Sequence, residues 1–490
     1  MNPSAGDSRW VVWLSAAAGF AIVGCTWALA TARYGGPDEP AHVIRAAAAA
    51  HGDLLGEAVA RLEPGYRVVT APAPLASGDP ACYRHNEFVT AECATPTRAA
   101  GDVEVATSAG VAPPWYYAVV GAIGRAFSSG ADVMAYRMAT VLVFAIILGA
   151  AFMRSREVGG ASWLLAAMTP SAWFLLGVVG TSGVEIALIA VALVEAVGRL
   201  RDPDTSASLA RVSVPLAVCL VMRPAALVDI AVVALVIAPT LRPLSTKRVA
   251  ALVLPLVMAG AATFGWNHWT GLIFSDRRTA DSDSIARALG RSLGGIPLTV
   301  HQAIGALGWN EFFAPVPAQL VWIVVLGFAV HWTVTHSNHS SVRRWHAQWI
   351  VAALLLPTLL EVIVHDRVGS IWQGRYSISF AMAGVLFAAS CKISPERRVM
   401  RVVVMCSAFA EVLTLWHTLR RYMVGLDGSF TLQHAAWNPP VNAWVLLAIN
   451  AAAIAWLASL ALSPPTPPSL VAAAVPQRRD SDEVREDHMM

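Results

Sequence analysis

Long uncharged stretches of the chain are separated by short polar segments. Residues 11–32, 138–153, 249–266 and 441–462 are almost free of charged side chains, and their lengths approach the ~20 residues that span a bilayer as a helix. Their apolar residues lie on all sides of a helix rather than along one face, so we expect lipid around them. The whole pattern predicts about twelve transmembrane helices, near residues 10–32, 132–153, 161–179, 184–199, 210–222, 225–241, 248–267, 318–335, 347–364, 371–391, 400–418 and 441–462.

The composition agrees with this pattern. Hydrophobic residues make up 56% of the chain and charged residues 14%, whereas soluble domains carry about 25% charged residues. Many of the 18 tryptophans lie near the ends of the apolar runs, as aromatic residues do at a membrane surface. We therefore predict an all-α integral membrane protein, with a membrane domain at 1–462 and a disordered cytoplasmic tail at 463–490.

Basic residues indicate how the chain is oriented, because they concentrate on the cytoplasmic side of a membrane. With a cytoplasmic N-terminus, nearly all dense basic clusters fall inside and the C-terminus is also cytoplasmic. The exceptions are Arg277 with Arg278, in a long outer loop, and Arg420 with Arg421, at a helix end. The prediction is a multi-pass protein of the plasma membrane, with the inner clusters Arg154/Arg156, Arg199/Arg201/Arg211, Arg242/Lys247/Arg248, Arg343/Arg344, Lys392/Arg397/Arg398/Arg401 and Arg478/Arg479.

The largest extracytoplasmic segment is the first loop, residues 33–131. Its apolar stretch 113–127 must not cross the membrane, since a crossing there would move most later basic clusters outside. The stretch begins with two prolines, which suit the first turn of a helix, so we predict a juxtamembrane helix. Cys82 and Cys93 lie in the same loop, in a compartment that permits disulfides. We predict a disulfide between them, with two free thiols as the alternative.

The first loop opens with two adjacent carboxylates. Asp38 and Glu39 stand between Pro37 and Pro40 at the membrane surface, where charges are costly. One of them is a candidate general base toward a sugar hydroxyl, and both are candidate ligands for a divalent cation (Mg²⁺, Mn²⁺ or Ca²⁺). His42 and Arg45 follow as candidate substrate-binding residues. The alternative is a solvated loop with an acidic N-cap for a helix at 41–50.

Other candidates come from later outer segments. Glu185 lies in the turn at 180–185, with a helix N-terminal acid as the alternative interpretation. Trp309 and Glu311 lie in GWNEFF, where the alternative is an interfacial anchor. Arg375 and Tyr376 lie in WQGRY; an arginine at that depth suits a phosphate, or an ordinary intramembrane salt bridge. Arg223 is a weaker case of the same kind.

Several functions are disfavoured. The net charge is +3 and the basic residues are dispersed, so we predict no nucleic-acid binding. No Walker-type loop appears, which disfavours ATP hydrolysis. The Gly-x-Ser-x-Gly match at 290–294 has no preceding strand and is attributed to chance.

Five segments occur in the order found in a known family. PDEPAH, PPWYY, MTPSAWFLLGVVGTSGVE, GALGWNEFFAP and WQGRY resemble the bacterial domain-of-unknown-function 2142 membrane family, over roughly residues 10–460. That family resembles the GT-C superfamily of glycosyltransferases, which use polyprenyl-phosphate-linked sugars. The resemblance implies that Asp38 or Glu39 acts as a general base or a metal ligand, and that Glu185 stands at the position of the superfamily's second acidic residue. It also implies a GT-C-like fold with juxtamembrane helices in the first loop.

The expected function is transfer of a sugar from a polyprenyl-phosphate donor to a cell-envelope glycan or glycolipid, on the extracytoplasmic face. No cofactor beyond a divalent cation is expected. Two alternatives remain open: a transporter or flippase for an envelope lipid or polysaccharide, and a non-catalytic assembly subunit. The Ala- and Arg-rich usage is typical of a high-GC bacterium such as an actinobacterium, for which arabinose or mannose donors are the expectation.

Overall fold

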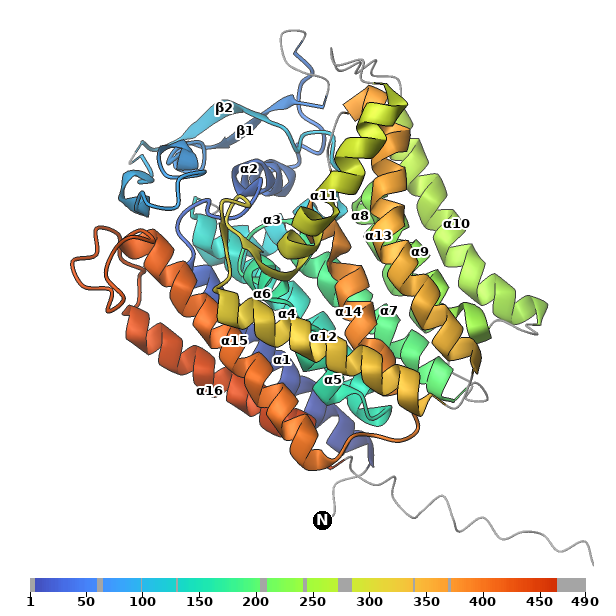
Figure 1. The fold of residues 1–490 in the computed structure, drawn as a ribbon. Helices are drawn as coiled ribbons and strands as arrows, with labels where there is room; N and C mark the ends of the chain where they lie inside the picture. The colour runs from blue at the N-terminus through green and yellow to red at the C-terminus, as the bar shows by residue number, and fades with distance from the viewer. Residues whose placement is uncertain are drawn as a thin grey trace, which may run out of the picture.

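A computed structural model describes residues 5–59, 65–97, 99–128, 131–202, 209–240, 245–271, 284–337, 340–368 and 372–464. Within these ranges the chain forms sixteen α-helices, short 3-10 turns and two small antiparallel sheets (Figure 1). The helices are α1 (Ala5–Ala30), α2 (Glu39–Ala50), α3 (Pro114–Ser128), α4 (Val133–Glu157), α5 (Ala161–Ala167), α6 (Pro170–Leu176), α7 (Thr181–Arg201), α8 (Ala210–Met222), α9 (Leu227–Ile237), α10 (Thr246–Trp269), α11 (Ile285–Gly305), α12 (Val316–His336), α13 (Ser340–Val368), α14 (Ile378–Leu386), α15 (Arg397–Met423) and α16 (Ala443–Leu462). The strands are β1 (Arg67–Pro72), β2 (Asp102–Thr107), β3 (Ala306–Leu307) and β4 (Phe312–Phe313).

Six helices among the described residues are long and apolar enough to cross a membrane: α1, α4, α10, α12, α15 and α16. The pair α6 and α7 also passes this test together, although the two are bent by 119° at their break. Shorter apolar helices lie at Ala210–Met222, Pro224–Ile237 and Gln348–Ile363. The all-α membrane class is therefore confirmed, whereas length and composition support six or seven of the twelve predicted spans.

Two of the remaining predicted spans are broken for local reasons. The segment 161–179 divides into α5 and α6 where Thr169 and Pro170 interrupt the helix. Proline lacks the N–H that a continuing helix needs, and the Thr169 side chain caps α6 by accepting from Ala172 N at 3.0 Å. The segment 371–391 likewise contains a 3-10 turn, η5 (Gly374–Ser377), followed by the nine-residue α14.

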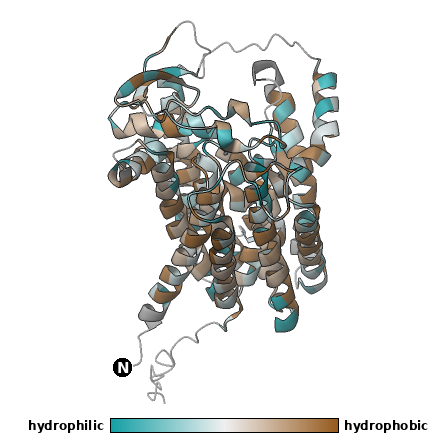
Figure 2. Cartoon of the chain, turned by 90° about the vertical axis from the view of Figure 1, so that its left-hand side faces the viewer, coloured by the Kyte–Doolittle hydropathy of each residue, from teal (hydrophilic) through white to brown (hydrophobic). Residues whose placement is uncertain are grey.

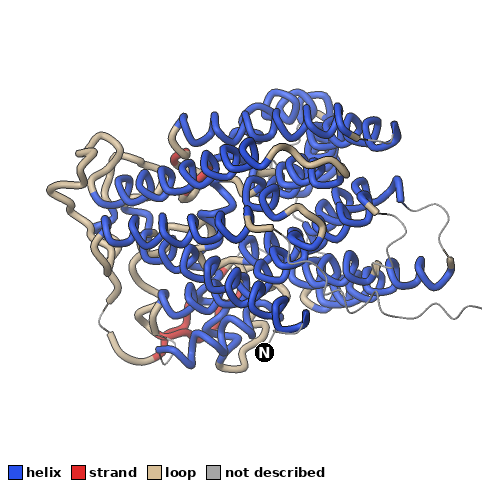
Figure 3. Tube along the Cα trace, turned by 90° about the horizontal axis from the view of Figure 1, so that it is seen from below, coloured by secondary structure: helices blue, strands red, loops and turns tan. Residues whose placement is uncertain are grey.

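The bundle is built around α1 and α4, which pack against each other, with α16 against α1 and α7 against α4. Small residues let the helices approach closely. A Cβ added at Gly149 of α4 would lie 2.9 Å from the Ala17 side chain and 3.0 Å from the Trp13 carbonyl oxygen of α1. Viewed from below, the long helices run alongside one another and the loops gather mainly at one end (Figure 3).

A loop-rich layer covers that end of the bundle. It contains α2, α3 and the hairpin β1–β2, in which Arg67 pairs with Thr107 and Pro72 with Asp102. Figure 2 shows this layer as richer in hydrophilic residues than the helices beneath it. The helix α3 packs on α2 and α4 and is not among the candidate spans, as its predicted juxtamembrane role requires.

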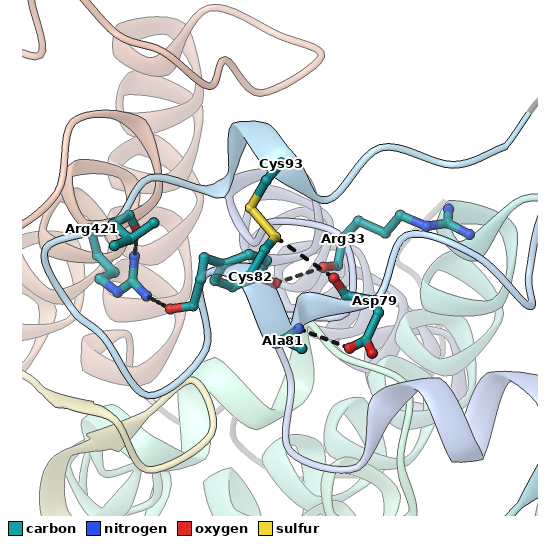
Figure 4. Close-up of a disulfide and its surroundings, with 8 residues drawn as sticks. Arg33, Asp79, Ala81, Cys82, Cys93 and Arg421 are labelled. Atoms are coloured by element: carbon teal, nitrogen blue, oxygen red, sulfur yellow. Dashed lines mark hydrogen bonds between the residues drawn. A yellow bond between two sulfur atoms is a disulfide. The ribbon is translucent and has the colours of Figure 1, made fainter.

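A disulfide joins Cys82 and Cys93 in this layer, as predicted. Figure 4 shows how the surrounding loop is tied to the bundle. Tyr83 donates its hydroxyl to the Arg33 carbonyl at 2.6 Å, and Arg421 at the end of α15 donates to the Tyr83 carbonyl at 2.8 Å. The basic pair at 420–421, an exception to the charge rule, thus includes a residue that anchors the first loop.

The segment 268–317, expected to be a long loop, contains the 21-residue helix α11. Its serine in the Gly-x-Ser-x-Gly match, Ser292, lies on this helix rather than after a strand. The tail predicted at 463–490 falls, from residue 465 onward, outside the described residues.

Candidate functional site

Asp38 occupies the sharp junction between α1 and α2. Its backbone is left-handed, with φ of 60°, and it stands at the N-cap position of α2 without making a side-chain capping bond. The carboxylate instead accepts from Arg375 Nη2 at 2.8 Å, and its side chain is 49% exposed. Asp38 therefore occupies the N-cap position without capping the helix through its side chain, and its carboxylate is turned toward a charged partner 337 positions away.

This ion pair lies in the wall of a polar cavity of about 280 Å³. The α1–α2 junction contributes Asp38 and His42, and α3 contributes Tyr117. The turn before α7, Arg223 after α8, and Arg375 with Tyr376 form further parts of the wall. Chain segments far apart in sequence therefore meet around one space beneath the loop layer.

On the cationic side of the cavity, Arg223 and Arg375 both contact the ring of Tyr376. The guanidinium carbon of Arg223 lies 4.3 Å from the centre of the Tyr376 ring, and that of Arg375 lies 5.2 Å from it. Arg375 also donates to the Tyr376 hydroxyl at 3.2 Å. Its Nε–H has no partner among the described residues, so the guanidinium keeps a donor for an anion. Two positive charges thus flank one aromatic ring.

Glu185 lies behind this cationic side. It pairs with Arg223 at 3.2 Å and is nearly buried. The predicted acidic residue of the second outer turn is therefore held by an arginine that itself lines the cavity. The ion pair fixes the Arg223 guanidinium in the cavity wall, so this geometry gives Glu185 a positioning role.

His42 faces the cavity from the first turn of α2. Its Nδ1 is 2.8 Å from the Tyr117 hydroxyl, and the two rings stack with centres 5.8 Å apart. Burial lowers the pKa of His42 to about 4, and the nearby Asp38 carboxylate offsets only part of this effect. Burial alone would raise the pKa of Asp38, but the charge and hydrogen bond of Arg375, with smaller contributions from His42 and Arg223, together outweigh it, so this pKa is below its usual value. At neutral pH the cavity therefore holds a neutral imidazole beside a carboxylate.

Glu39 points the other way, into the protein. Its Oε1 accepts from Arg137 Nε at 2.7 Å and from Val179 N at 2.9 Å, while its Oε2 accepts from Arg137 Nη2 at 2.7 Å and Gly36 N at 3.2 Å. Neither side chain is more than 1% exposed. Arg137 gives its remaining donors to the carbonyls of Ala28, Thr31 and Ala32. All five donors of this guanidinium are used.

The other predicted residues lie outside the cavity wall. Arg45 is buried and donates to the carbonyls of Asp53, Leu54 and Ala112, which fastens the end of α2 to the loop layer.

Trp309 and Glu311 make contacts of the same kind. Trp309 donates to the Tyr34 carbonyl at 2.9 Å, and Glu311 pairs with Arg421 at 3.1 Å with both side chains of that pair fully buried. These contacts tie the GWNEFF segment to the chain after α1 and to the end of α15, and do not test whether it anchors the protein at a membrane surface.

The described residues do not form a ready-made site for a divalent cation. Among the described residues, no group of three or more His, Cys, Asp or Glu side chains could hold a metal ion. Glu39 has both oxygens occupied by N–H donors, and Asp38 is turned to an arginine. Ca²⁺ needs several oxygen ligands around one point, which these two carboxylates do not supply together, whereas Mg²⁺ is often held by one or two carboxylates with waters and a substrate phosphate. The divalent cation therefore stays a prediction.

The family model for "Predicted membrane protein (DUF2142)" matches residues 20–384. The chain belongs to the DUF2142 family. Asp38, Glu185, Arg223 and Arg375 all fall inside the matched region. Among solved structures, the crystal structure of ArnT from Cupriavidus metallidurans in the apo state aligns with 94% of this chain and 77% of its own, at 13% identity and a TM-score of 0.43. No curated protein sequence matches the chain.

Sequence reasoning missed several residues of this DUF2142 site. Arg137 had a usable signal, because an arginine inside an apolar span requires a buried acidic partner. Asn267, near the C-terminal end of α10, lines the cavity, and its side-chain oxygen has no partner among the described residues. Tyr117 lies in the PPWYY segment, but only packing shows that its hydroxyl meets His42.

Proposed function

We propose that this protein transfers a sugar from a polyprenyl-phosphate donor to a cell-envelope glycan or glycolipid, on the extracytoplasmic side of the plasma membrane. The observation that carries the proposal is the cavity itself. It combines one half-exposed carboxylate, Asp38, with the two guanidinium groups of Arg223 and Arg375. A carboxylate suits proton abstraction from a hydroxyl, and guanidinium groups suit a phosphate.

In this mechanism the donor phosphate binds between Arg223 and Arg375. Arg375 then shifts from Asp38 to the phosphate, so the carboxylate loses the cation that lowers its pKa and becomes a stronger base. The acceptor hydroxyl oxygen attacks the anomeric carbon and gives its proton to Asp38. The bond from that carbon to the phosphate oxygen breaks, and polyprenyl phosphate leaves with the bonding electrons.

The remaining residues hold these groups in place. Glu185 fixes Arg223 against the ring of Tyr376. His42, neutral and held by Tyr117, offers its other ring nitrogen to a sugar hydroxyl. Glu39 acts through Arg137 as a positioning residue, because their contacts join the end of α1, the start of α2 and the turn before α7 around Asp38.

The test is transfer of radiolabelled sugar from polyprenyl-phosphate donors by the purified protein in lipid bilayers. Asp38→Asn keeps the size and the preference for a left-handed backbone but removes the basic oxygen, so we expect transfer to fall about 10²–10⁴-fold. Asp79→Asn is the matched control, since Asp79 caps a turn in the first loop at 2.8 Å from Ala81 N. Unchanged transfer in Asp38→Asn overturns the mechanism. Movement of labelled lipid across the bilayer without transfer supports a flippase instead.

A further inference from the structure

A second cavity, also of about 280 Å³, lies on the other side of the Arg375 segment. Its wall is formed by α11, α12, α13 and α14. Carbon atoms dominate this wall, with side chains such as Ile296, Leu326, Ala353 and Phe380. This space has no role in the acid–base chemistry described above.

Several polar groups in this apolar cavity have partners within the wall, whereas the indole N–H groups of Trp322 and Trp349 are buried without a partner among the described residues. Ser292 donates to Glu361 at 2.6 Å, Thr358 donates to the Leu354 carbonyl of its own helix at 3.3 Å, and Trp372 donates to Ser377 at 3.1 Å. A sugar or nucleotide would find few polar partners in such a space, whereas a hydrocarbon chain needs none.

The cavity is also bordered by helices apolar enough to lie in a membrane. One wall is α12, a candidate span, and another is the apolar stretch Gln348–Ile363 of α13. Wall residues keep accessible surface, including Ile350 at 39% and Leu354 at 37%, so the cavity is open rather than sealed. Their neighbours Val351 and Leu355 on the same helix are 55% and 50% exposed, which leaves an apolar helix surface beside the cavity for a lipid chain.

One short turn joins the two cavities. Within and beside η5 (Gly374–Ser377), Arg375 and Tyr376 line the polar cavity, while Trp372 and Ser377 line the apolar one. The Trp372 and Tyr376 rings meet edge to face with centres 5.6 Å apart. Gly374 holds the turn against α11: its N–H donates to Gln302 at 3.0 Å, and a Cβ there would lie 2.2 Å from the Gln302 Cβ.

We propose that the apolar cavity between α11, α12, α13 and α14 binds the hydrocarbon chain of a polyprenyl phosphate whose phosphate meets Arg375. This inference rests on the proposed function and identifies where the lipid part of its donor lies. The main support is that the cationic cavity and the apolar cavity lie on either side of one short turn, η5. A lipid phosphate needs both kinds of site close enough for a single molecule to occupy them together.

A sugar-free probe tests this site independently of catalysis. The probe is a long-chain polyprenyl monophosphate with a photoreactive group on its chain, added to the protein in bilayers. We expect crosslinks on the cavity walls and about tenfold weaker labelling in Ala353→Trp, since the indole occupies space that the hydrocarbon chain would take; tenfold corresponds to about 1.4 kcal/mol of binding free energy. Val351→Trp is the matched control: it lies on the same helix, is 55% exposed and does not line the cavity.

Three results overturn the proposal: crosslinks elsewhere, equal labelling in Ala353→Trp, or equal competition by a diacyl phospholipid, which would mean an ordinary membrane lipid occupies the space. If Ala353→Trp aggregates, the smaller Ala381→Leu on α14 decides instead. Transfer from a two-isoprene donor should persist in the filled variant while transfer from the long-chain donor falls. If the unmodified protein transfers no sugar at all, the proposed function is contradicted, but the crosslinking result still tests the lipid site.

Discussion

The Asp38 cavity and the Glu39–Arg137 cluster begin at adjacent residues but differ in nearly every physical respect. The Asp38 carboxylate is half-exposed and has one arginine contact in a space that admits a ligand. The Glu39 carboxylate is fully buried and accepts four N–H donors. Burying a charged group is costly unless hydrogen bonds within the protein replace those it made to water. The Glu39 carboxylate has such replacements, whereas the Asp38 carboxylate still relies on solvent.

This difference shows that two adjacent carboxylates can have separate functions, one structural and one chemical. The Glu39 cluster joins three backbone carbonyls at the end of α1 to the start of α2 and the turn before α7. Asp38 is thereby held in a left-handed conformation that an aspartate adopts less readily than a glycine. One carboxylate builds the wall of the cavity, and its neighbour is left free to react within it.

Breaking the Glu39 cluster should have the largest effect. Glu39→Ala leaves the Arg137 guanidinium buried without its counter-charge, which costs about 3–5 kcal/mol. We expect the variant to lose most of its folded population, measured by size-exclusion chromatography and thermal unfolding in detergent. The double variant Glu39→Leu with Arg137→Leu should be more stable than Glu39→Ala, since no unpaired charge remains.

Glu157→Ala is the control for this prediction. Glu157 pairs with Arg9 and Arg154 near a membrane surface and is 29% exposed, so its loss should cost at most about 1 kcal/mol. If Glu39→Ala instead folds normally and only its transfer activity falls, Glu39 belongs with Asp38 in the chemistry.

The second prediction concerns the cationic side of the cavity. Arg375→Lys keeps the positive charge but loses the planar fork that grips two phosphate oxygens. We expect the KM for the polyprenyl-phosphate donor to rise about 10–100-fold, with thermal stability nearly unchanged, in initial-rate measurements. Arg397→Lys is the control, because Arg397 donates only to the Leu462 carbonyl at an exposed position. A loss of stability without a change in KM means that Arg375 serves only to hold Asp38.

The apolar runs and the charge distribution were sufficient to predict the membrane class, the juxtamembrane helix α3 and the disulfide. They also placed Asp38, Glu185 and Arg375 on one predicted face, and the structure brings Asp38 and Arg375 into contact. These predictions were possible because each of them depends on local composition or on the number of membrane crossings. Neither local composition nor the number of crossings depends on how the helices pack.

The distinction between Asp38 and Glu39 required packing. Arg137 is 98 positions from Glu39, and only the approach of α4 to the α1–α2 junction brings the two together. Arg45, Trp309 and Glu311 show the same limit: as sequence they resemble ligand-binding residues, yet their contacts fasten the loop layer. The helix α11 was missed because its apolar positions are interrupted by glycines and a proline.

The smallest predicted effect concerns His42 and acid stability. The pKa of His42 is about 4 in the folded protein, against 6.5 for an ordinary histidine. Between these values the unfolded chain binds a proton that the folded protein does not, so stability falls as the pH is lowered from 6.5 toward 4. His42→Gln removes this titration but keeps a polar side chain near Tyr117. We expect its melting temperature to drop less than that of the unmodified protein between pH 7 and pH 5, by roughly 2–4 °C. Equal drops in both proteins mean that His42 takes up its proton freely in the folded state, and the neutral imidazole assigned to the cavity is then incorrect.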